Sequence, residues 1–570
     1  MSTSVVSTNL ARCRDCYRCV RACSVKAVRV ENGQAQVVPE LCIACGSCVL
    51  ECPQGAKVVR DDRPKVREAI AAGRTVVASV APSAPAFFEM RSFAQMETAL
   101  GKLGFAAAGE TAFGAEMVGL AHKDWVTDHP QSQPVVTSSC PVVVNLIEKY
   151  YPDLIPHLAP LVSPLLAHGR WLKDKYPGAL IVFIGPCIAK KGEIDDEAVA
   201  GVIDAALTFE ELQEWFEAEH VEWPSAAPES LPVPRANARL FPVEGGLVGT
   251  AKMDTDILAS NIVTTSGLEA CRDVLDSIRA AKLDAEMVEL MACEGGCING
   301  PAMKSTGSIY LARQRVIAYA TQRQPEPLPE RGEWPDLERA YTDRGVSAPE
   351  FSDQDIQRVL HLVDKYTTED ELNCGACGYA TCREKAIATL RGMAEATMCI
   401  PYMRRRAEGL RQVIMAVTPE PVIIVDTRLR IQDISPSAES MFCCQESTVV
   451  GQPLQTILPN VESFARVRST GHTVVGERIQ VRDGLILEQS IVPVKGQSLI
   501  VGVLRDVTEQ VGQQEQLERI RTETLKRTQE VVHKQMVVAQ EIAQLLGETT
   551  AESKMMLSKL AKLLEEGKGQ

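Results

Sequence analysis

Eight cysteines near the start of the sequence are spaced closely enough to bind metal. The runs CRDCYRCVRAC and CIACGSCVLECP both follow the pattern C-x2-C-x2-C-x3-C. This spacing lets three thiolates of one loop bind three corners of a cubane iron–sulfur cluster. A zinc site or a disulfide knot would use the same residue type, but zinc motifs do not have this doubled spacing. Residues 5–60 are therefore expected to transfer electrons. Their cysteines are Cys13, Cys16, Cys19, Cys23, Cys42, Cys45, Cys48 and Cys52.

The doubled run resembles the bacterial two-cluster ferredoxin pattern, in which the fourth cysteine of each run binds the other cluster. The resemblance implies a ferredoxin-like domain over residues 1–63 with two [4Fe-4S] clusters. One cluster would be bound by Cys13, Cys16, Cys19 and Cys52. The other would be bound by Cys42, Cys45, Cys48 and Cys23.

A second group of cysteines lies in LNCGACGYATCREKAIATLRGMAEATMC, where C-x2-C-x4-C is followed by a helical stretch and a fourth cysteine. Glycines within the loop permit the tight turn that cluster thiolates need. The segment resembles the small four-cysteine iron–sulfur domain found beside redox enzymes, and it implies a third [4Fe-4S] cluster within residues 354–407. A zinc ion is the alternative. The ligands would be Cys374, Cys377, Cys382 and Cys399.

Four further cysteines stand in isolated turns: Cys140 in TSSCP, Cys187 in FIGPC, and the pair Cys293 and Cys297 in LMACEGGC. Each one alone would be read as a buried apolar thiol. All four, however, lie within two residues of glycine or proline, and two follow apolar runs typical of buried strands, one of them at Ile181–Ile184. Thiols at strand ends predict a cofactor pocket between the layers of an α/β domain.

These segments resemble the three signature motifs of the [FeFe]-hydrogenase catalytic domain, over about residues 70–320, which gives an expected domain at 64–321. The resemblance implies an H-cluster, a [4Fe-4S] cubane joined to a diiron site that carries CO and cyanide. Cys140, Cys187, Cys293 and Cys297 would bind the cubane, and Cys297 would also bridge to the diiron site. Lys190 matches the lysine that binds a cyanide ligand through a charge-assisted hydrogen bond.

Several positions depart from the family pattern. Efficient members have a proton-relaying cysteine immediately before the one that matches Cys140, and here that residue is Ser139, whose hydroxyl is a far weaker acid. The departures predict a cluster that is assembled but has a damaged proton path, and therefore slow hydrogen turnover. The other departing positions are Gly185 in place of methionine, Gly300, Pro301 and Ala302 in place of a glycine run, and Ala121 and His122 in place of a glutamate pair.

The remaining third of the chain indicates signalling. Residues 322–353 are rich in proline and charge and are expected to be a linker. Residues 408–511 resemble a PAS domain, with a hairpin, a short helix through Met441 and alternating strands, or else form a generic α+β domain. Residues 512–570 are expected to be an output or oligomerisation segment of two helices that break at Gly547. His533 has no ATP-binding region after it, and Cys443 and Cys444 are adjacent and are interpreted as structural.

Composition limits the partners. The net charge of −14 disfavours nucleic-acid binding, and no apolar stretch is long enough to span a membrane. Nineteen cysteines without an export signal favour metal binding in the cytoplasm over disulfides. The expected fold is multidomain, α+β and α/β.

Two functions are expected: a hydrogen or redox sensor with slow turnover, or a catalytic hydrogenase subunit that exchanges electrons with ferredoxin. An H-cluster-free relative in iron–sulfur assembly is a third. The resemblance implies molecular hydrogen and protons as substrates. It also implies a serine phosphatase or kinase as a signalling partner, and self-association as a homodimer.

Overall fold

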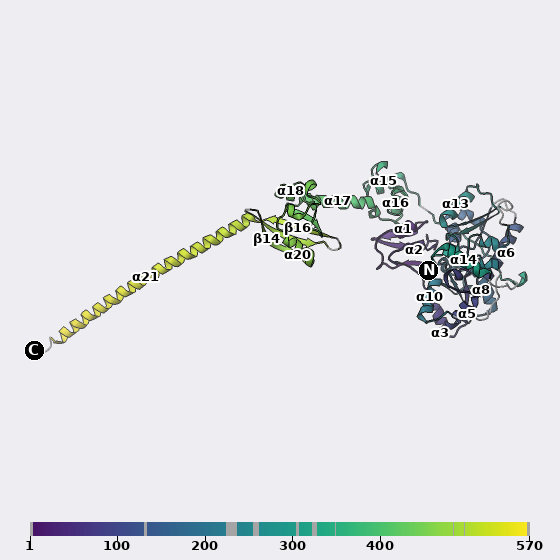
Figure 1. Ribbon diagram of the computed structural model, residues 1–570, viewed down its shortest axis with the longest axis horizontal. Helices are drawn as coiled ribbons and strands as arrows, with labels where there is room; N and C mark the ends of the chain where they lie inside the picture. Colours follow the sequence, from purple (N-terminus) through teal and green to yellow (C-terminus); the bar gives the residue numbers. More distant parts are fainter. Residues whose placement is uncertain are drawn as a thin grey trace. The chain divides into compact units, whose positions relative to one another are not determined.

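The computed structural model describes residues 4–129, 134–223, 236–254, 261–303, 307–321, 328–347, 349–482, 484–494, 496 and 498–566. The chain divides into two compact units, Met1–Met403 and Arg404–Gln570, whose elements are labelled in Figure 1. Within the described residues, no helix is both long and apolar enough to cross a membrane.

The first unit begins with two small antiparallel sheets that surround the cysteine runs. β1 pairs with β4, and β2 pairs with β3. Short helices α1 and α2 start within the two runs, so the cysteines lie in loops and first turns. The bounds are β1 Val6–Thr8, α1 Arg18–Ala22, β2 Val28–Glu31, β3 Gln34–Val37, α2 Ser47–Leu50 and β4 Lys57–Val59.

A four-stranded parallel sheet of order β6-β5-β8-β9 forms the centre of this unit. Its strands are buried along their whole length, as expected when helices cover both faces of a parallel sheet. The strand predicted at Ile181–Ile184 is confirmed within β8. The elements around it are α3 Arg63–Ala71, β5 Val76–Val80, α4 Ala84–Phe87, α5 Phe93–Lys102, β6 Ala107–Glu110, α6 Ala112–Asp128, α8 Pro164–Lys175, β8 Leu180–Gly185, α9 Ala189–Glu193, β9 Ala205–Thr208 and α10 Phe209–Ala218.

A second parallel sheet of order β10-β11-β7 packs against α7 and α13. The apolar run before Cys293 forms β11, as the sequence predicts. The bounds are β7 Val135–Val136, α7 Pro141–Tyr150, η1 Pro152–His157, α11 Ala236–Arg239, α12 Gly246–Thr250, β10 Ile262–Ser266, α13 Leu268–Arg279, β11 Met287–Met291, η3 Cys297–Asn299 and α14 Ile309–Ala320.

The segment 322–353, which is expected to be a linker, is packed against the protein in its described part. Its described part packs against the central domain: Leu337 and Arg339 are buried, and Tyr341 donates a hydrogen bond to the Leu161 carbonyl at 2.7 Å. We call residues 336–346 the strap. Proline and charged residues are common in this segment and are typical of a linker. Two of its charged side chains, however, form ion pairs with the central domain: Arg339 with Glu193 and Asp196, and Arg344 with Glu148. The strap leads to α15 Asp353–His361 and α16 Cys382–Leu390.

The second unit contains a five-stranded antiparallel sheet of order β13-β12-β16-β15-β14 with short helices between β13 and β14. The predicted hairpin is β12 and β13, and the predicted short helix through Met441 is α18. The bounds are β12 Val422–Asp426, β13 Ile431–Ile434, α18 Pro436–Phe442, α19 Glu446–Val449, α20 Glu462–Thr470, β14 Val474–Arg482, β15 Leu485–Pro493 and β16 Leu499–Asp506. Helix α17, Ile400–Val417, precedes this sheet in the chain.

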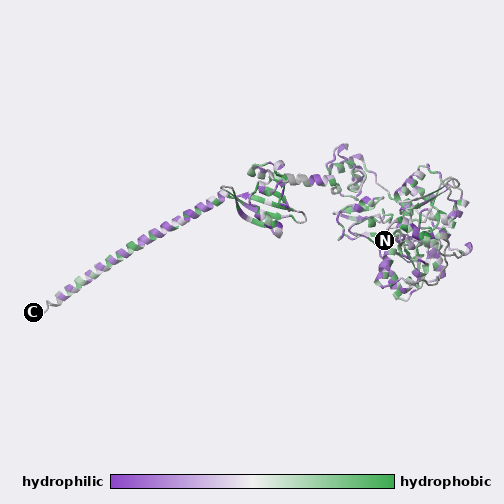
Figure 2. Ribbon diagram, in the orientation of Figure 1, coloured by the Kyte–Doolittle hydropathy of each residue, from purple (hydrophilic) through white to green (hydrophobic). Residues whose placement is uncertain are grey.

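The chain ends in one long helix, α21, which runs from Thr508 to Glu566. The helix break predicted at Gly547 is wrong. A glycine in a helix interior costs only about 1 kcal/mol relative to alanine, and the residues after it include no proline that would remove a backbone donor. Figure 2 shows hydrophobic and hydrophilic residues interleaved along this helix.

Candidate metal centres

The eight cysteines of the first sixty residues form two sets in space. Burial raises the pKa of Cys19, the Lys57 charge lowers it, and the nearby Cys13, Cys16 and Cys52 raise it. Burial likewise raises the pKa of Cys23 to about 11, and there the neighbouring thiols are Cys45 and Cys42. The fourth cysteine of each run therefore lies with the first three of the other run, as the spacing implies.

Backbone amides support these sulfur positions. The amide of Ala27 donates to Cys23 Sγ at 3.2 Å, and the amide of Ala56 donates to Cys52 Sγ at 3.2 Å. N–H groups aimed at sulfur favour the thiolate, which is the form that binds iron.

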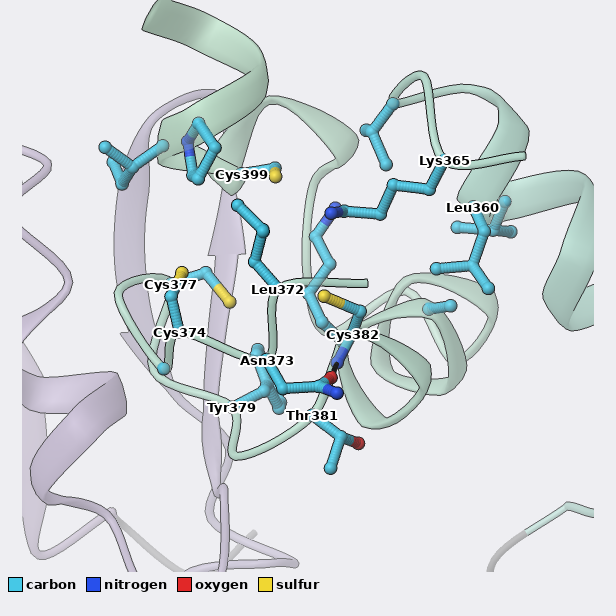
Figure 3. A pocket seen from close by; sticks show the side chains of 17 residues that line it. Leu360, Lys365, Leu372, Asn373, Cys374, Cys377, Tyr379, Thr381, Cys382 and Cys399 are labelled. Carbon is cyan, nitrogen blue, oxygen red and sulfur yellow. Dashed lines mark hydrogen bonds between the residues drawn. The ribbon is translucent and has the colours of Figure 1, made fainter. Parts of the chain in front are cut away.

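The third set of cysteines lines a pocket next to α15 and α16 (Figure 3). Cys382 starts α16, where Thr381 caps the helix, and Asn373 Oδ1 accepts a hydrogen bond from the Cys382 amide at 2.8 Å. Lys385 lies in the same pocket and donates to the Ala396 carbonyl at 3.0 Å. The structure thus brings together Cys374, Cys377, Cys382 and Cys399.

The four isolated cysteines, Cys140, Cys187, Cys293 and Cys297, line one cavity with an empty volume of about 610 Å³. The elements that carry them belong to both parallel sheets. Cys187 follows β8 of one sheet, Cys293 follows β11 of the other, and Cys140 is the N-cap of α7. Ligand sites at the carboxyl ends of parallel strands are the rule for α/β sheets.

The chemistry of this donor set fits an iron cluster. Burial raises the pKa of Cys293 and of Cys297, and the neighbouring thiols raise both further. Four thiols that line one pocket are stabilised as thiolates when a cationic metal balances their charge. Among the residues that the structure describes, no group of three or more His, Cys, Asp or Glu is arranged to hold a single metal ion.

Lys190 and Ser139 line the same cavity. The Lys190 ammonium lies 2.7 Å from Glu193 Oε2 and 3.4 Å from the Ser139 carbonyl oxygen. Ser139 Oγ is buried and, among the described residues, has no hydrogen-bond partner. An ammonium and an unpaired hydroxyl at a cavity wall are available to a bound group.

Comparisons with known proteins agree with this site. Residues 74–301 match the family model "Iron only hydrogenase large subunit, C-terminal domain", residues 5–53 match a "4Fe-4S dicluster domain", and residues 370–401 match the model described as "Putative Fe-S cluster". Residues 74–301 form a domain of the [FeFe]-hydrogenase family. They are preceded by a ferredoxin-like iron–sulfur domain and followed by a second iron–sulfur domain.

Similar proteins include hydrogenases and assembly factors. The NADP-reducing hydrogenase subunit HndD of Solidesulfovibrio fructosivorans is 25% identical over 60% of this chain and 72% of its own length. The periplasmic [Fe] hydrogenase large subunit of Nitratidesulfovibrio vulgaris is 28% identical over 55% and 93%. A probable cytosolic Fe-S cluster assembly factor of Brugia malayi is 21% identical over 49% and 75%.

Parts of the chain are also similar to solved structures. A variant of [FeFe]-hydrogenase HydA1 from Chlamydomonas reinhardtii is 18% identical, with 49% of this chain and 99% of that chain covered, at a TM-score of 0.39. A PAS domain of an HTR-like protein from Haloarcula marismortui is 17% identical over 18% and 98%, at a TM-score of 0.15.

Two departures of the hydrogenase domain have a structural basis. A Cβ atom built at Gly185 would lie 2.5 Å from Phe183 Cζ, so the Phe183 ring occupies the space that a methionine there would need. His122 is fully buried, its Nδ1 lies 2.8 Å from the Val118 carbonyl oxygen, and burial lowers its pKa to about 4. His122 is therefore neutral, and Ala121 beside it has no group that transfers a proton.

Glu289 also lines the cavity of the hydrogenase domain, although no motif in the sequence points to it. Its carboxylate accepts hydrogen bonds from the amides of Leu247 at 3.1 Å and Val248 at 3.3 Å. Its pKa is raised to about 7, chiefly by burial. The two amide hydrogen bonds lower the pKa, and the nearby Glu244 charge raises it. The signal was a single acidic residue inside the apolar run MVELMAC.

Three cysteines are outside these sets. Cys271 is buried on α13 and lies 3.4 Å from the Met291 carbonyl oxygen. Cys443 is exposed at the end of α18, and Cys444 packs partly against the core of the second unit. Their positions are consistent with structural roles.

Proposed function

We propose that this chain is a hydrogen or redox sensor built on an [FeFe]-hydrogenase domain, with slow hydrogen turnover. The observation that carries the proposal is Ser139, which lines a cavity together with four cysteines and Lys190 and has a buried hydroxyl without a hydrogen-bond partner among the described residues. The residues fit an H-cluster, which when bound supplies the formation and cleavage of hydrogen at its diiron site. Cys140, Cys187, Cys293 and Cys297 would hold it, and Cys297 would bridge its two parts.

The surrounding residues suit binding better than rapid proton transfer. Lys190 presents an ammonium, a strong donor to an anionic ligand. Ser139 presents a hydroxyl that gives up its proton poorly at neutral pH. The pocket therefore retains the groups that bind the cofactor, whereas the group that would relay protons is weakened.

Electrons would reach the hydrogenase domain through neighbouring iron–sulfur sites. The Cys45 thiol is close enough to Cys293 to raise its pKa, after burial and three nearer thiols. On the other side, Arg21 donates to the Ala376 carbonyl of the four-cysteine site at 2.9 Å. Three [4Fe-4S] clusters outside the active site would thus form a relay, with ferredoxin as a suitable electron partner.

The second unit would report the state of this site. Its five-stranded antiparallel sheet has a strand order that suits a PAS domain, and α21 presents many exposed apolar side chains. We propose an output through self-association or through a regulatory enzyme such as a serine phosphatase or kinase, in the cytoplasm.

Two other functions have support. Hydrogenases among the similar proteins favour a catalytic subunit that exchanges electrons with ferredoxin. The assembly factors among them favour an H-cluster-free role in iron–sulfur assembly.

Infrared spectroscopy of protein treated with the diiron cofactor separates these functions. The sensor predicts CO and cyanide bands together with low turnover per loaded site. Bands with high turnover would support the catalytic subunit. Absence of bands in protein that has its full set of cubanes would exclude the sensor and support the assembly role.

A further inference from the structure

The strap places a buried arginine behind the hydrogenase cavity. Arg339 lies 3.3 Å from Glu193 Oε1 and 2.9 Å from Asp196 Oδ2. The other oxygen of Glu193 is the one that pairs with Lys190. The side chains of Arg339 and Glu193 are only 5% and 3% exposed, so water screens this chain of charges very little.

Glu193 is shared between two cations, and this sharing affects Lys190. With Arg339 in place, the carboxylate divides its charge, and the ammonium keeps donors for the Ser139 carbonyl and for the cavity. Without Arg339, the whole carboxylate charge would act on Lys190 and draw its ammonium toward α9. A buried charge that loses one partner reorganises around the other.

The strap also contacts the elements that carry Cys140. The Leu161 carbonyl accepts hydrogen bonds from both Tyr341 and Ser138, each at 2.7 Å. On α7, which begins directly after Cys140, Glu148 pairs with Arg344 and accepts a bond from the Thr342 amide at 2.9 Å. One segment of chain therefore contacts residues of two helices, α7, which begins directly after Cys140, and α9, which begins two residues after Cys187.

The same groups border a second, polar cavity with an empty volume of about 860 Å³. Arg339, Arg344, Glu193, Asp196 and Asn145 all line it. Later in the chain, α15 packs against α16 of the four-cysteine domain.

We propose that Arg339 is a positioning residue that sets the Lys190 ammonium through Glu193. The proposal rests on the proposed function, because Lys190 is given its role by the group that the cavity would hold.

The test uses full-length protein loaded with its clusters and the diiron cofactor. Three variants are compared with wild type: Arg339→Gln, which removes the charge; Arg339→Lys, which keeps it; and Arg331→Gln as a control, which removes an exposed strap-side arginine paired with Asp124. The readout is the frequency of the cyanide bands in the infrared spectrum, which reports hydrogen bonding to that ligand.

We expect Arg339→Gln to shift a cyanide band, Arg339→Lys to return it toward the wild-type frequency, and Arg331→Gln to leave it unchanged. Unchanged bands in Arg339→Gln protein with its full iron content would overturn the proposal. An equal shift in Arg331→Gln would also overturn it, because the effect would then belong to any change near the strap.

A second measurement decides the matter if wild type shows no cyanide bands and the proposed function fails. Hydrogen exchange is followed in protein that carries only its cubanes. Arg339→Gln should speed exchange of the amides in residues 189–196 several-fold, and Arg339→Lys should restore slow exchange. Exchange as slow as wild type in Arg339→Gln would show that Arg339 does not position this helix.

Discussion

Ser139 lines the cavity with a hydroxyl where a cysteine would place a more acidic thiol. Ser139→Cys should raise hydrogen turnover per loaded site at least tenfold, since a positioned acid or base contributes about 10²–10⁴-fold to proton transfer. The measurement is hydrogen evolution normalised to the intensity of the CO bands. The matched control is Ser139→Ala, which should resemble wild type.

If Ser139→Cys gains nothing, the block lies further out. His122 is buried with its pKa lowered to about 4, so it is a weak base at neutral pH, and Ala121 has no titratable group. A proton would therefore bind poorly at this segment.

Glu289 should make stability depend on pH. Its folded pKa, raised to about 7 chiefly by burial, exceeds its usual value of 4.5. The folded protein therefore binds more protons than the unfolded chain between these values, so stability falls as pH rises through this window. The loss is on the order of 3 kcal/mol when complete. Glu289→Gln should flatten the change in denaturation midpoint over this range, and an undiminished slope would show that Glu289 is not its source.

Lys57 carries a buried positive charge between the two ferredoxin-like sites. Its ammonium donates to Thr8 Oγ1 and to the Ala35 carbonyl, both at 2.7 Å, and its charge lowers the pKa of cysteines in both sets. Lys57→Met should make the reduction potentials of both clusters more negative, because an added electron would lose a favourable charge. A redox titration followed by electron paramagnetic resonance measures this. Lys57→Arg should stay close to wild type.

Sequence reasoning reached the cysteines because their ligand spacing is local. Cys374, Cys377 and Cys382 are within nine residues of one another, and the doubled run needs only two loops. Glu289 and Arg339 acquire their roles from contacts with distant segments, Leu247 in one case and Glu193 in the other. No pattern within either segment specifies such a contact.

At the scale of elements, the sequence predicts the buried strands correctly but not the end of the last helix. Continuous apolar runs between turn residues are typical of buried strands, and they predict β8 and β11. α21 was expected to break at Gly547, but a single glycine does not end a long helix. The strap is predicted to be a linker because an arginine is usually exposed, and the sequence does not show that Arg339 is buried.

Helix α21 should mediate association and nothing else. Val531, Val538, Ile542 and Leu545 on this helix are each at least half exposed, and a helix with this surface needs a packed partner. Cutting the chain after Glu509 should leave iron content and hydrogen chemistry unchanged and abolish self-association. Sedimentation velocity at several protein concentrations measures the loss of self-association. Loss of hydrogen chemistry on truncation would show instead that the tail serves the hydrogenase domain.

At the scale of the whole molecule, the iron–sulfur sites of the first unit follow one another in space. The four-cysteine domain contacts the ferredoxin-like domain again through the Val30 amide, which donates to the Met393 carbonyl at 3.0 Å. The thiols of Cys377 and Cys23 both raise the pKa of Tyr379, after burial. Cys23 is in the same set as Cys45, whose charge raises the pKa of Cys293 in the hydrogenase site. An electron could therefore pass from residues 370–401 to the cavity through one intermediate set.

The iron content tests this arrangement as a count. Four cubanes and one diiron site give about 18 irons for each chain, and about 16 before the diiron site is installed. Cys374→Ser should remove one cubane and lower the second figure to about 12, because three thiolates and a serine hold a cubane poorly. Cys443→Ser is the matched control, since Cys443 is exposed in the second unit and lies in none of the sets; it should keep all 16. Metal analysis of reconstituted protein gives both numbers. Wild-type protein that saturates near 12 irons with one zinc would show that residues 370–401 hold zinc, and the relay would then reach the cavity from the ferredoxin-like domain alone.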